Sequence, residues 1–304
     1  MIVENKFLCH VCGDEAFFLL SKDDYRLYKC SECGLVFVSP QPTQQFLADT
    51  LYSYESGYQA NRVEDLAKTQ EPERVSFIYD YFEKVCPKGK ILDVGCGNGQ
   101  TLYWAKKRGF DPYGIEVNKR TADHANKNGL PVYNGFLEDA PYDKNSFDLM
   151  FLGEIIEHIN SPRDFIINCS SLLKNGGYVG ITTPNLNCPW SKTNYLLYKF
   201  FGIPWSSVTP PYHLFQFNDE NLDRLMKEFG FDYVSGNFSW IPPLKYELGM
   251  LHLLKRYKKS KRITDLIFMI FSYVIYTINH FFFRLLHPFF KRDFQMNRIY
   301  KKNV

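Results

Sequence analysis

Three glycines at alternating positions follow an apolar run that has the pattern of a buried strand. The run 91–94 contains Asp93, and the chain continues as Gly95-Cys96-Gly97-Asn98-Gly99 into a helix-like stretch. Only glycine lets a backbone turn this sharply and approach a ligand without a Cβ atom in the way. A further acid, Glu116, ends the next apolar run, where a carboxylate can accept hydrogen bonds from both hydroxyls of a ribose. The spacing predicts a cofactor site between two strand ends.

A second group of chemically useful side chains comes after the apolar run 147–152. It contains Glu154, Glu157 and His158, which share one face if the segment is helical. Such a group could bind a divalent metal or move a proton, because the ordinary pKa of histidine lies near neutrality. The alternative is a helix start with acids near the positive end of the dipole. Ligands bind at the carboxyl ends of strands in open α/β sheets, which favours the functional interpretation.

A lone histidine, His213, is the second catalytic candidate. It lies in Pro210-Pro211-Tyr212-His213, beyond an expected strand end at 182–185. One isolated histidine is weak evidence for catalysis, so a packed or capping role stays open beside the catalytic one.

Four of the eight cysteines are paired by spacing. Cys9 and Cys12 are separated by two residues, and so are Cys30 and Cys33. This spacing is typical of a zinc ribbon in which four thiolates close a tetrahedral, structural site. The metal would stabilise a segment too small to form its own core. The remaining cysteines are expected to be buried free thiols.

The elements that must position these residues alternate between apolar and amphipathic runs, as βαβ units require. Strands are expected at 90–94, 111–116, 132–135, 147–152, 177–182 and 231–237, with a last strand at 294–300. Helices are expected at 74–85, 100–108, 119–128, 163–173 and 220–228. The pattern predicts an α/β fold with a parallel sheet and helices on both faces.

Composition limits the class of protein. The net charge is +3 and 23% of residues are charged, which argues against a nucleic-acid partner. The segment 1–6 lacks the charged and apolar regions of an export signal, so a cytoplasmic location without disulfides is expected. Oligomeric state is not indicated.

The glycine turn preceded by Asp93, together with Glu116, resembles the cofactor motif of class I S-adenosylmethionine (SAM) methyltransferases, over about residues 70–240. The pattern is most similar to that of ubiquinone-biosynthesis O-methyltransferases, which carry a similar E-x-x-E-H segment, and of related sugar or lipid methyltransferases. The ribbon resembles those of sugar methyltransferases and of some ribosomal-RNA methyltransferases, so it does not select the substrate. The resemblance implies a Rossmann-like, seven-stranded sheet and methyl transfer from SAM to a hydroxyl.

The resemblance also implies roles for individual residues in SAM binding. Gly95 and Gly97 would line the methionine part, Glu116 would hold the ribose, and Arg74 would clamp the carboxylate. The cofactor site is expected to include Asp93, Gly99 and Gly153 as well.

Two further parts of the site depend on the resemblance. Where the family has an aspartate for the adenine amine, this chain has Phe136, so Phe136, Leu137 and main-chain groups are expected to hold adenine. Glu154, Glu157 and His158 would hold Mg²⁺ against the substrate oxygen, although these residue types accept Zn²⁺ or Mn²⁺ too.

The segment 244–304 is basic, aromatic and helical in pattern. Residues 266–283 contain no charged side chain and follow a basic run at 255–262. An interfacial membrane contact is favoured by this arrangement, with a buried or dimer-forming helix and a membrane span as alternatives. An aromatic insertion at 189–211 could admit a lipid-linked acceptor or simply cap the pocket.

The sequence therefore predicts a zinc ribbon at 1–40, a linker or lid at 41–73, a methyltransferase core at 74–243 and the segment 244–304, which supplies the last strand. The expected acceptor is a hydroxyl on a lipid-linked, quinone-like or polysaccharide-precursor sugar molecule. An RNA methyltransferase and a non-catalytic, SAM-binding membrane adaptor are the alternatives.

Overall fold

The computed structural model describes residues 7–304 except 23, 51–64, 240–242, 252, 287, 288 and 290–292. The first half contains β1 (Phe7–Leu8), β2 (Glu15–Lys22), β3 (Tyr25–Cys30), β4 (Val36–Val38), α1 (Gln44–Thr50), η3 (Leu66–Lys68), α2 (Glu73–Val85), β5 (Lys90–Val94), α3 (Gln100–Lys107), β6 (Asp111–Glu116), α4 (Lys119–Lys127), β7 (Val132–Asn134), η4 (Leu137–Asp139) and β8 (Phe147–Gly153). The second half contains η5 (Ile156–His158), α5 (Pro162–Leu172), β9 (Leu173–Pro184), α6 (Pro189–Phe201), β10 (Phe215–Gln216), α7 (Asp219–Glu228), β11 (Phe231–Ser239), α8 (Leu244–Met250), α9 (Leu253–Ser260), α10 (Ile263–Leu286) and β12 (Gln295–Lys302). Part of the predicted linker, 51–64, lies outside the described residues.

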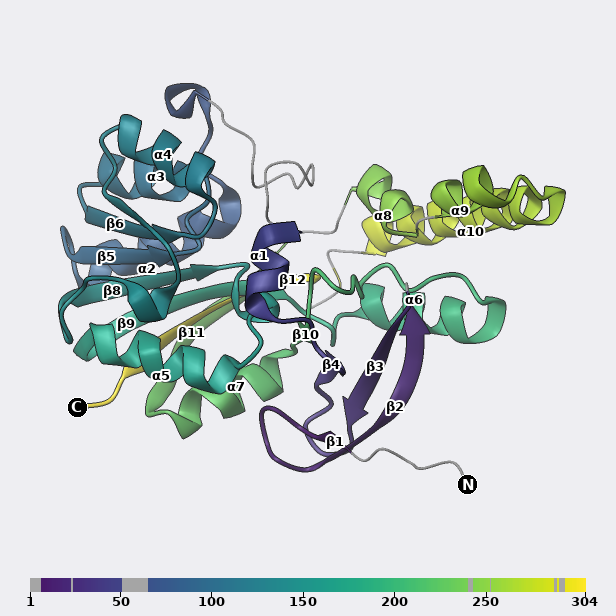
Figure 1. The fold of residues 1–304 in the computed structure, drawn as a ribbon, viewed down its shortest axis with the longest axis horizontal. Helices are drawn as coiled ribbons and strands as arrows, with labels where there is room; N and C mark the ends of the chain where they lie inside the picture. Colours follow the sequence, from purple (N-terminus) through teal and green to yellow (C-terminus); the bar gives the residue numbers. More distant parts are fainter. Residues whose placement is uncertain are drawn as a thin grey trace.

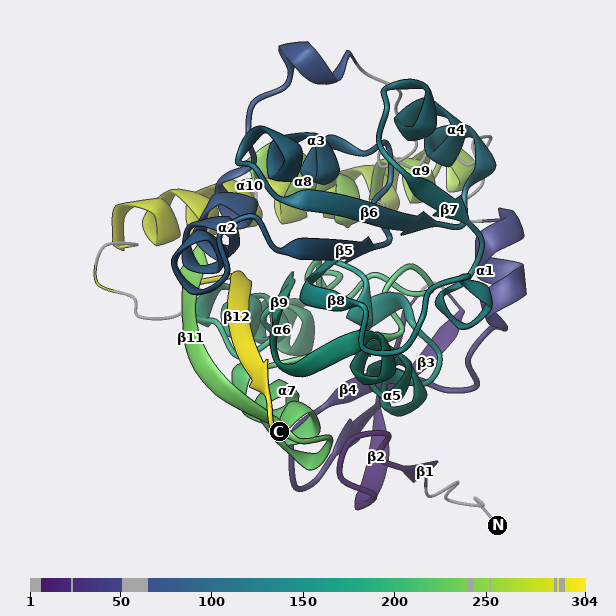
Figure 2. The same cartoon turned by 90° about the vertical axis from the view of Figure 1, so that its left-hand side faces the viewer.

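In the described part of the chain, seven strands form the central sheet in the order β11-β12-β9-β8-β5-β6-β7. The strands β5 to β9 pair in parallel, whereas β12 runs antiparallel to both of its neighbours, β9 and β11. Helices α2, α3 and α4 cover one face, and α5 and α7 cover the other (Figure 2). The predicted Rossmann-like α/β sheet and its last strand are confirmed.

Local sequence explains where the elements of the sheet begin and end. β5 and β6 have the predicted bounds, because each is an apolar run buried along most of its length. Asn118, Ser161 and Asn218 begin α4, α5 and α7, and each side-chain oxygen accepts a backbone N–H of the first turn. These caps place each helix start beside a strand end.

A second sheet holds the N-terminal cysteines. Its order is β1-β2-β3-β4-β10, so its last strand comes from the methyltransferase-like body rather than from residues 1–40. Phe215 of β10 pairs with Phe37 of β4, and the Val38 N–H donates to the carbonyl of Leu214 at 2.9 Å. Buried side chains on one side of this sheet, such as Tyr28 and Phe37, belong to the same hydrophobic cluster as those under α5 and α7. Those on the other side, such as Leu27 and Val38, pack with Trp205. The ribbon is therefore packed as part of the body (Figure 1).

An arm made of α8, α9 and α10 lies between β11 and β12 in the chain. It extends away from the central sheet and lies beside α6 (Figure 1). Trp190 of α6 contacts the rings of Tyr276 and Phe283 of α10, with centroids 6.0 and 5.3 Å apart. Because β11 and β12 pair along their length, the arm begins and ends at the same edge of the sheet.

Candidate active site

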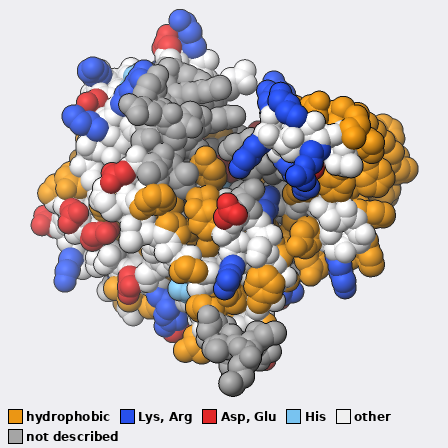
Figure 3. All heavy atoms as spheres, turned by 45° about the vertical axis from the view of Figure 1, so that its right-hand side comes forward, with side chains coloured by type: hydrophobic (Ala, Val, Ile, Leu, Met, Phe, Trp, Pro, Cys, Tyr) orange, Lys and Arg blue, Asp and Glu red, His pale blue; other side chains and the backbone are white. Residues whose placement is uncertain are grey.

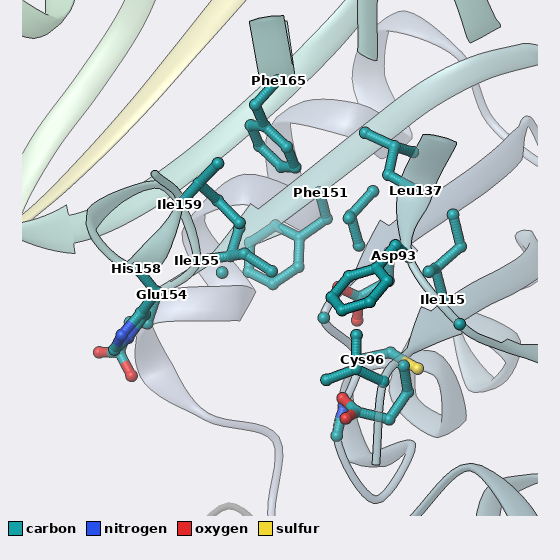
Figure 4. Close-up of a pocket in the computed structure, with 18 of the residues that line it drawn as sticks. Asp93, Cys96, Ile115, Leu137, Phe151, Glu154, Ile155, His158, Ile159 and Phe165 are labelled. Atoms are coloured by element: carbon teal, nitrogen blue, oxygen red, sulfur yellow. The ribbon is translucent and has the colours of Figure 1, made fainter. Parts of the chain in front are cut away.

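A cavity of about 540 Å³ opens at the carboxyl ends of the parallel strands (Figure 4). This volume lies in the range of pockets for small molecules and cofactors. The predicted residues that line it are Asp93, Gly95, Gly97, Glu116, Phe136, Leu137, Gly153, Glu154 and His158. Side chains of β5 and β6 stand at one side, and Glu154 and His158 stand together at another (Figure 4).

The glycine turn has the backbone conformation that the sequence predicts. Gly95 and Gly97 have φ of 78° and 54°, which lie in the left-handed region. A Cβ atom on Gly95 would lie 2.5 Å from Cδ1 of Ile155, a side chain of the cavity wall. Asp93 is buried and accepts a hydrogen bond from the Thr101 hydroxyl. At this turn backbone atoms line the cavity, in space that a side chain at position 95 would occupy.

Glu116 lies at the tip of β6, beside this turn. Its carboxylate accepts the N–H groups of Gly97 at 2.8 Å and of Asn118 at 2.7 Å. Burial raises the pKa of Glu116, and the backbone N–H groups oppose that rise. The carboxylate is therefore fixed at the cavity wall by main-chain donors, each oxygen keeping a second lone pair for a ligand.

The other two predicted cofactor residues are not among the described residues that line the cavity. Gly99 does not line the cavity: a Cβ atom there would lie 2.8 Å from Cβ of Ala125, so this glycine allows α3 and α4 to approach closely. Arg74 lies in α2, and its side chain is outside the described residues.

The predicted helical face of Glu154, Glu157 and His158 is wrong. Glu154 has a φ of 52°, and only residues 156–158 form a single 3₁₀ turn. Its N–H donates to the carbonyl of Thr182 at 2.8 Å, so the neighbouring strand β9 fixes this kink. Glu154 and His158 line the cavity, whereas Glu157 is buried behind its wall.

Glu157 meets two histidines there. Ligand atoms of Glu157, His158 and His213 lie within 4.8 Å of one another, and the two imidazole rings are 4.8 Å apart in an edge-to-face contact. The Thr183 hydroxyl donates to Glu157 at 2.9 Å. The metal-ligand group that the structure brings together therefore contains His213 and omits Glu154, in contrast to the prediction.

The tautomer of His158 follows from its surroundings. Its Nδ1 hydrogen-bonds the carbonyl oxygen of Tyr212, so Nδ1 carries the proton and Nε2 carries the acceptor lone pair. Burial lowers the pKa of His158 to about 4, and the bond to Tyr212 opposes that fall. Burial is the main cause that lowers the pKa of His213, and the positive charge that His158 would carry lowers it further. Burial therefore favours the neutral form of both imidazoles.

Several lining residues were not predicted. Gln44 of α1 reaches the cavity and accepts the N–H of Asn160 at 3.2 Å. Ser161, Asp164 and Asn168 line it from the start of α5. Asp164 and Asn168 are one helical turn apart, and this spacing predicts that they share a helix face. The spacing does not predict that this face borders the cavity, which depends on how α1 and α5 pack.

The four predicted zinc ligands are together at the tips of the ribbon hairpins. The sulfur atoms of Cys9, Cys12, Cys30 and Cys33 all lie within 4.8 Å of one another. Those of Cys9 and Cys33 are 3.5 Å apart. Four thiolates at this spacing are the donor set that structural Zn²⁺ takes.

Sequence comparison identifies a family and individual relatives of this chain. The family described as "Methyltransferase domain" matches residues 60–236. A ubiquinone biosynthesis O-methyltransferase of Pelagibacter ubique is 36% identical over 164 residues, which cover 50% of this chain and 68% of that protein. A second protein of that name, from Vibrio parahaemolyticus, is 30% identical over 38% of this chain and 52% of its own length. This chain thus spans about half to two thirds of these relatives.

Structural comparison agrees on the fold. The crystal structure of the [4+2]-cyclase SpnF superposes with a TM-score of 0.54 at 15% identity, over 87% of this chain and 97% of that one. At this identity the likeness concerns the arrangement of the sheet and helices alone.

Proposed function

Because this chain belongs to the methyltransferase domain family and is a class I SAM-dependent methyltransferase, we propose that it transfers the methyl group to a hydroxyl oxygen of its acceptor. The observation that carries the proposal is the position of Glu154 and His158, which lie on the cavity wall away from the glycine turn (Figure 4). We propose a lipid-linked, quinone-like or polysaccharide-precursor sugar molecule as acceptor.

In this proposal SAM lies between the glycine turn and η4. Gly95 and Gly97 contact the methionine part, and Glu116 accepts hydrogen bonds from the ribose. Phe136 and Leu137 pack on adenine, since both line the cavity at the start of η4. This places the sulfonium between the turn and the wall formed by β8 and η5.

His158 is the proton acceptor of the proposed reaction. The acceptor oxygen forms a bond to the methyl carbon while the carbon–sulfur bond breaks, and its electrons return to sulfur. The hydroxyl proton passes to Nε2, the lone pair of which is set by the bond from Nδ1 to Tyr212. Glu154, on the same wall, stabilises the imidazolium that results.

A divalent ion is the alternative to this proton transfer, because it would bind the same Nε2 lone pair of His158. Glu157, His158 and His213 supply one carboxylate and two neutral imidazoles, a donor set that suits Zn²⁺ or Mn²⁺ better than Mg²⁺, which prefers oxygen ligands. When bound, such an ion lowers the pKa of a hydroxyl in contact with it. The protein's own contribution would be to hold His158 in place through His213 and Glu157.

The ribbon is proposed to hold structural Zn²⁺ through its four cysteines. Its sheet shares β10 with the body, and the Leu214 N–H donates to the carbonyl of Glu157 at 2.8 Å. A bound ion would therefore stabilise the loop that carries His213 as well as the ribbon.

The test is to incubate the purified protein with methyl-labelled SAM and a lysate of its source cells, and then to separate lipid, small metabolites, RNA and protein. Label in a lipid or small-metabolite product that stays bound after mild alkali, as a methyl ether does, supports the proposal. His158→Ala should lose this product, whereas the matched variant His124→Ala on α4 should keep it.

Two outcomes would overturn the proposal. Label in RNA that falls steeply with added salt would make the protein an RNA methyltransferase. SAM binding without label in any fraction would favour a non-catalytic adaptor. In both cases the assignment of the SAM site would survive, because binding of the cofactor is measured separately by titration.

A further inference from the structure

The arm carries an apolar face that points away from the protein. Seven side chains spaced three or four residues apart along α10 form one stripe and are 49–66% exposed: Ile263, Ile267, Ile270, Val274, Ile278, Phe281 and Leu285. We call this stripe the apolar face. Hydrophobic side chains gather over the arm in the space-filling view, with lysine and arginine beside them (Figure 3).

The opposite face of α10, which contacts the body, combines apolar and polar side chains. Five partly buried side chains pack against the core of the arm: Phe268, Met269, Tyr273, Ile275 and Phe283. Ser272, Tyr276 and His280 are buried there. The Tyr276 hydroxyl donates to the carbonyl of Pro204 at 3.2 Å, and the Asn279 amide donates to Asn194 at 3.2 Å. α10 therefore carries apolar side chains on both sides. A helix that is apolar all round is normally buried, so the exposed stripe indicates that its outer surroundings are apolar as well.

Polar groups near the apolar face are compatible with a lipid environment. Thr277 is exposed, and its hydroxyl donates to the carbonyl of Tyr273 at 2.7 Å within the helix.

Phe201 of α6 contacts Phe271 of α10 with ring centroids 6.1 Å apart, and Phe200 beside it is 69% exposed. These aromatic side chains extend the apolar face onto α6.

A basic segment adjoins this face. Residues 253–262, which include α9, contain six lysines and arginines and no acid. Arg256 pairs with Asp265 at 2.9 Å, while Lys258, Lys259 and Lys261 are exposed. A second copy of the chain placed face to face would bring two such basic segments together, whereas anionic lipid headgroups would neutralise them.

A crossing of the bilayer does not fit the topology. α10 has 24 residues and a mean hydropathy of 1.7 over an 18-residue window, of which 17% is buried. Among the described residues it is the one helix apolar and long enough to span. However, β11 and β12 on either side of the arm pair in one sheet, so a single crossing would separate them.

We propose that the apolar face and the basic segment form a docking surface on which the protein lies against an anionic membrane, with α10 in the plane of the interface. The surface is joined to α6, which follows β9 at the edge where the cavity opens. The inference goes beyond the proposed function and does not depend on which acceptor is methylated.

The experiment is flotation of the full chain with vesicles of phosphatidylcholine alone or with about 30% phosphatidylglycerol. We expect binding to the anionic vesicles that weakens in high salt. Ile270→Glu should reduce the partition coefficient at least about tenfold. The matched control Ile167→Glu on α5, which replaces a side chain 49% exposed against 53% for Ile270, should leave it unchanged. Lys258→Glu with Lys259→Glu should reduce it about fivefold for each charge removed.

The alternatives give different results. Absence of flotation, or equal losses in the Ile270 and Ile167 variants, would overturn the proposal. An oligomer that Ile270→Glu converts to monomer without any vesicle binding would identify the face as a protein interface. Resistance to alkaline carbonate extraction would indicate a span. SAM titration of every variant checks the fold, and its result is independent of the acceptor assay.

Discussion

Alanine at position 95 would place one methyl group on the backbone of the proposed methionine site. Gly95 has a φ of 78°, where an alanine costs about 1 kcal/mol relative to glycine. The new Cβ would also lie 2.5 Å from Cδ1 of Ile155. Relief requires a rotation of the Ile155 side chain that moves Cδ1, and both residues line the cavity.

Gly109 provides a control for the backbone term. Its φ is 90°, and a Cβ atom there meets nothing within 4 Å. Gly109→Ala should therefore lower the free energy of unfolding by about 1 kcal/mol and leave SAM affinity unchanged. Gly95→Ala should cost about as much plus an overpacking term of about 1–3 kcal/mol, which we expect to appear as weaker SAM binding of at least about fivefold.

Urea unfolding and calorimetric titration with SAM measure the two quantities. Adding Ile155→Ala to Gly95→Ala should restore part of the affinity, because it removes the contacting methyl group. Equal SAM affinities in the Gly95 and Gly109 variants would refute the placement of the cofactor on this turn. So would a double variant no better than Gly95→Ala alone.

Three further predictions concern other parts of the molecule. His158→Ala should lower turnover about 10²-fold or more while SAM affinity stays within threefold; equal loss of both would make the residue structural. Cys30→Ser, or removal of metal by a chelator, should lower both the thermal midpoint of unfolding and the turnover, because the ribbon sheet contains β10, which directly follows His213. Unchanged turnover would show that the ribbon does not support the site. Burial raises the pKa of Glu247 to about 7 against an ordinary 4.5, so the folded state holds a proton that the unfolded chain has released. The free energy of unfolding should therefore be highest below about pH 4.5 and fall by up to about 3 kcal/mol as the pH rises through 7. Glu247→Gln should flatten this dependence when urea unfolding is measured at pH 5 and pH 7.5.

The parts of the fold that depend on local pattern were predictable. β5 and β6 are short, mostly buried runs that end at a turn signal, so their bounds and the position of Glu116 beside Gly97 follow from residue types. The close approach of the ribbon cysteines follows from their spacing in the same way. In each case the deciding contacts join neighbouring elements.

The parts that depend on distant contacts were not predictable. Glu154 leaves the helical region because its N–H bonds to Thr182 on another strand, which separates it from Glu157. The pairing of β10 with the ribbon and the approach of Gln44 to Asn160 also join residues far apart in the chain. No short-range pattern distinguishes these residues from ordinary polar or apolar ones.

The position of β12 affects the order in which the protein can fold during synthesis. Its two neighbours in the sheet, β9 and β11, are both made before it, and the arm is made between β11 and β12. Until β12 has left the ribosome, β9 has an unpaired edge and β11 lacks its partner in the sheet. In that interval the nascent chain already carries the complete apolar helix of the arm, so its first encounter with a lipid surface or a chaperone can precede the closing of its own core.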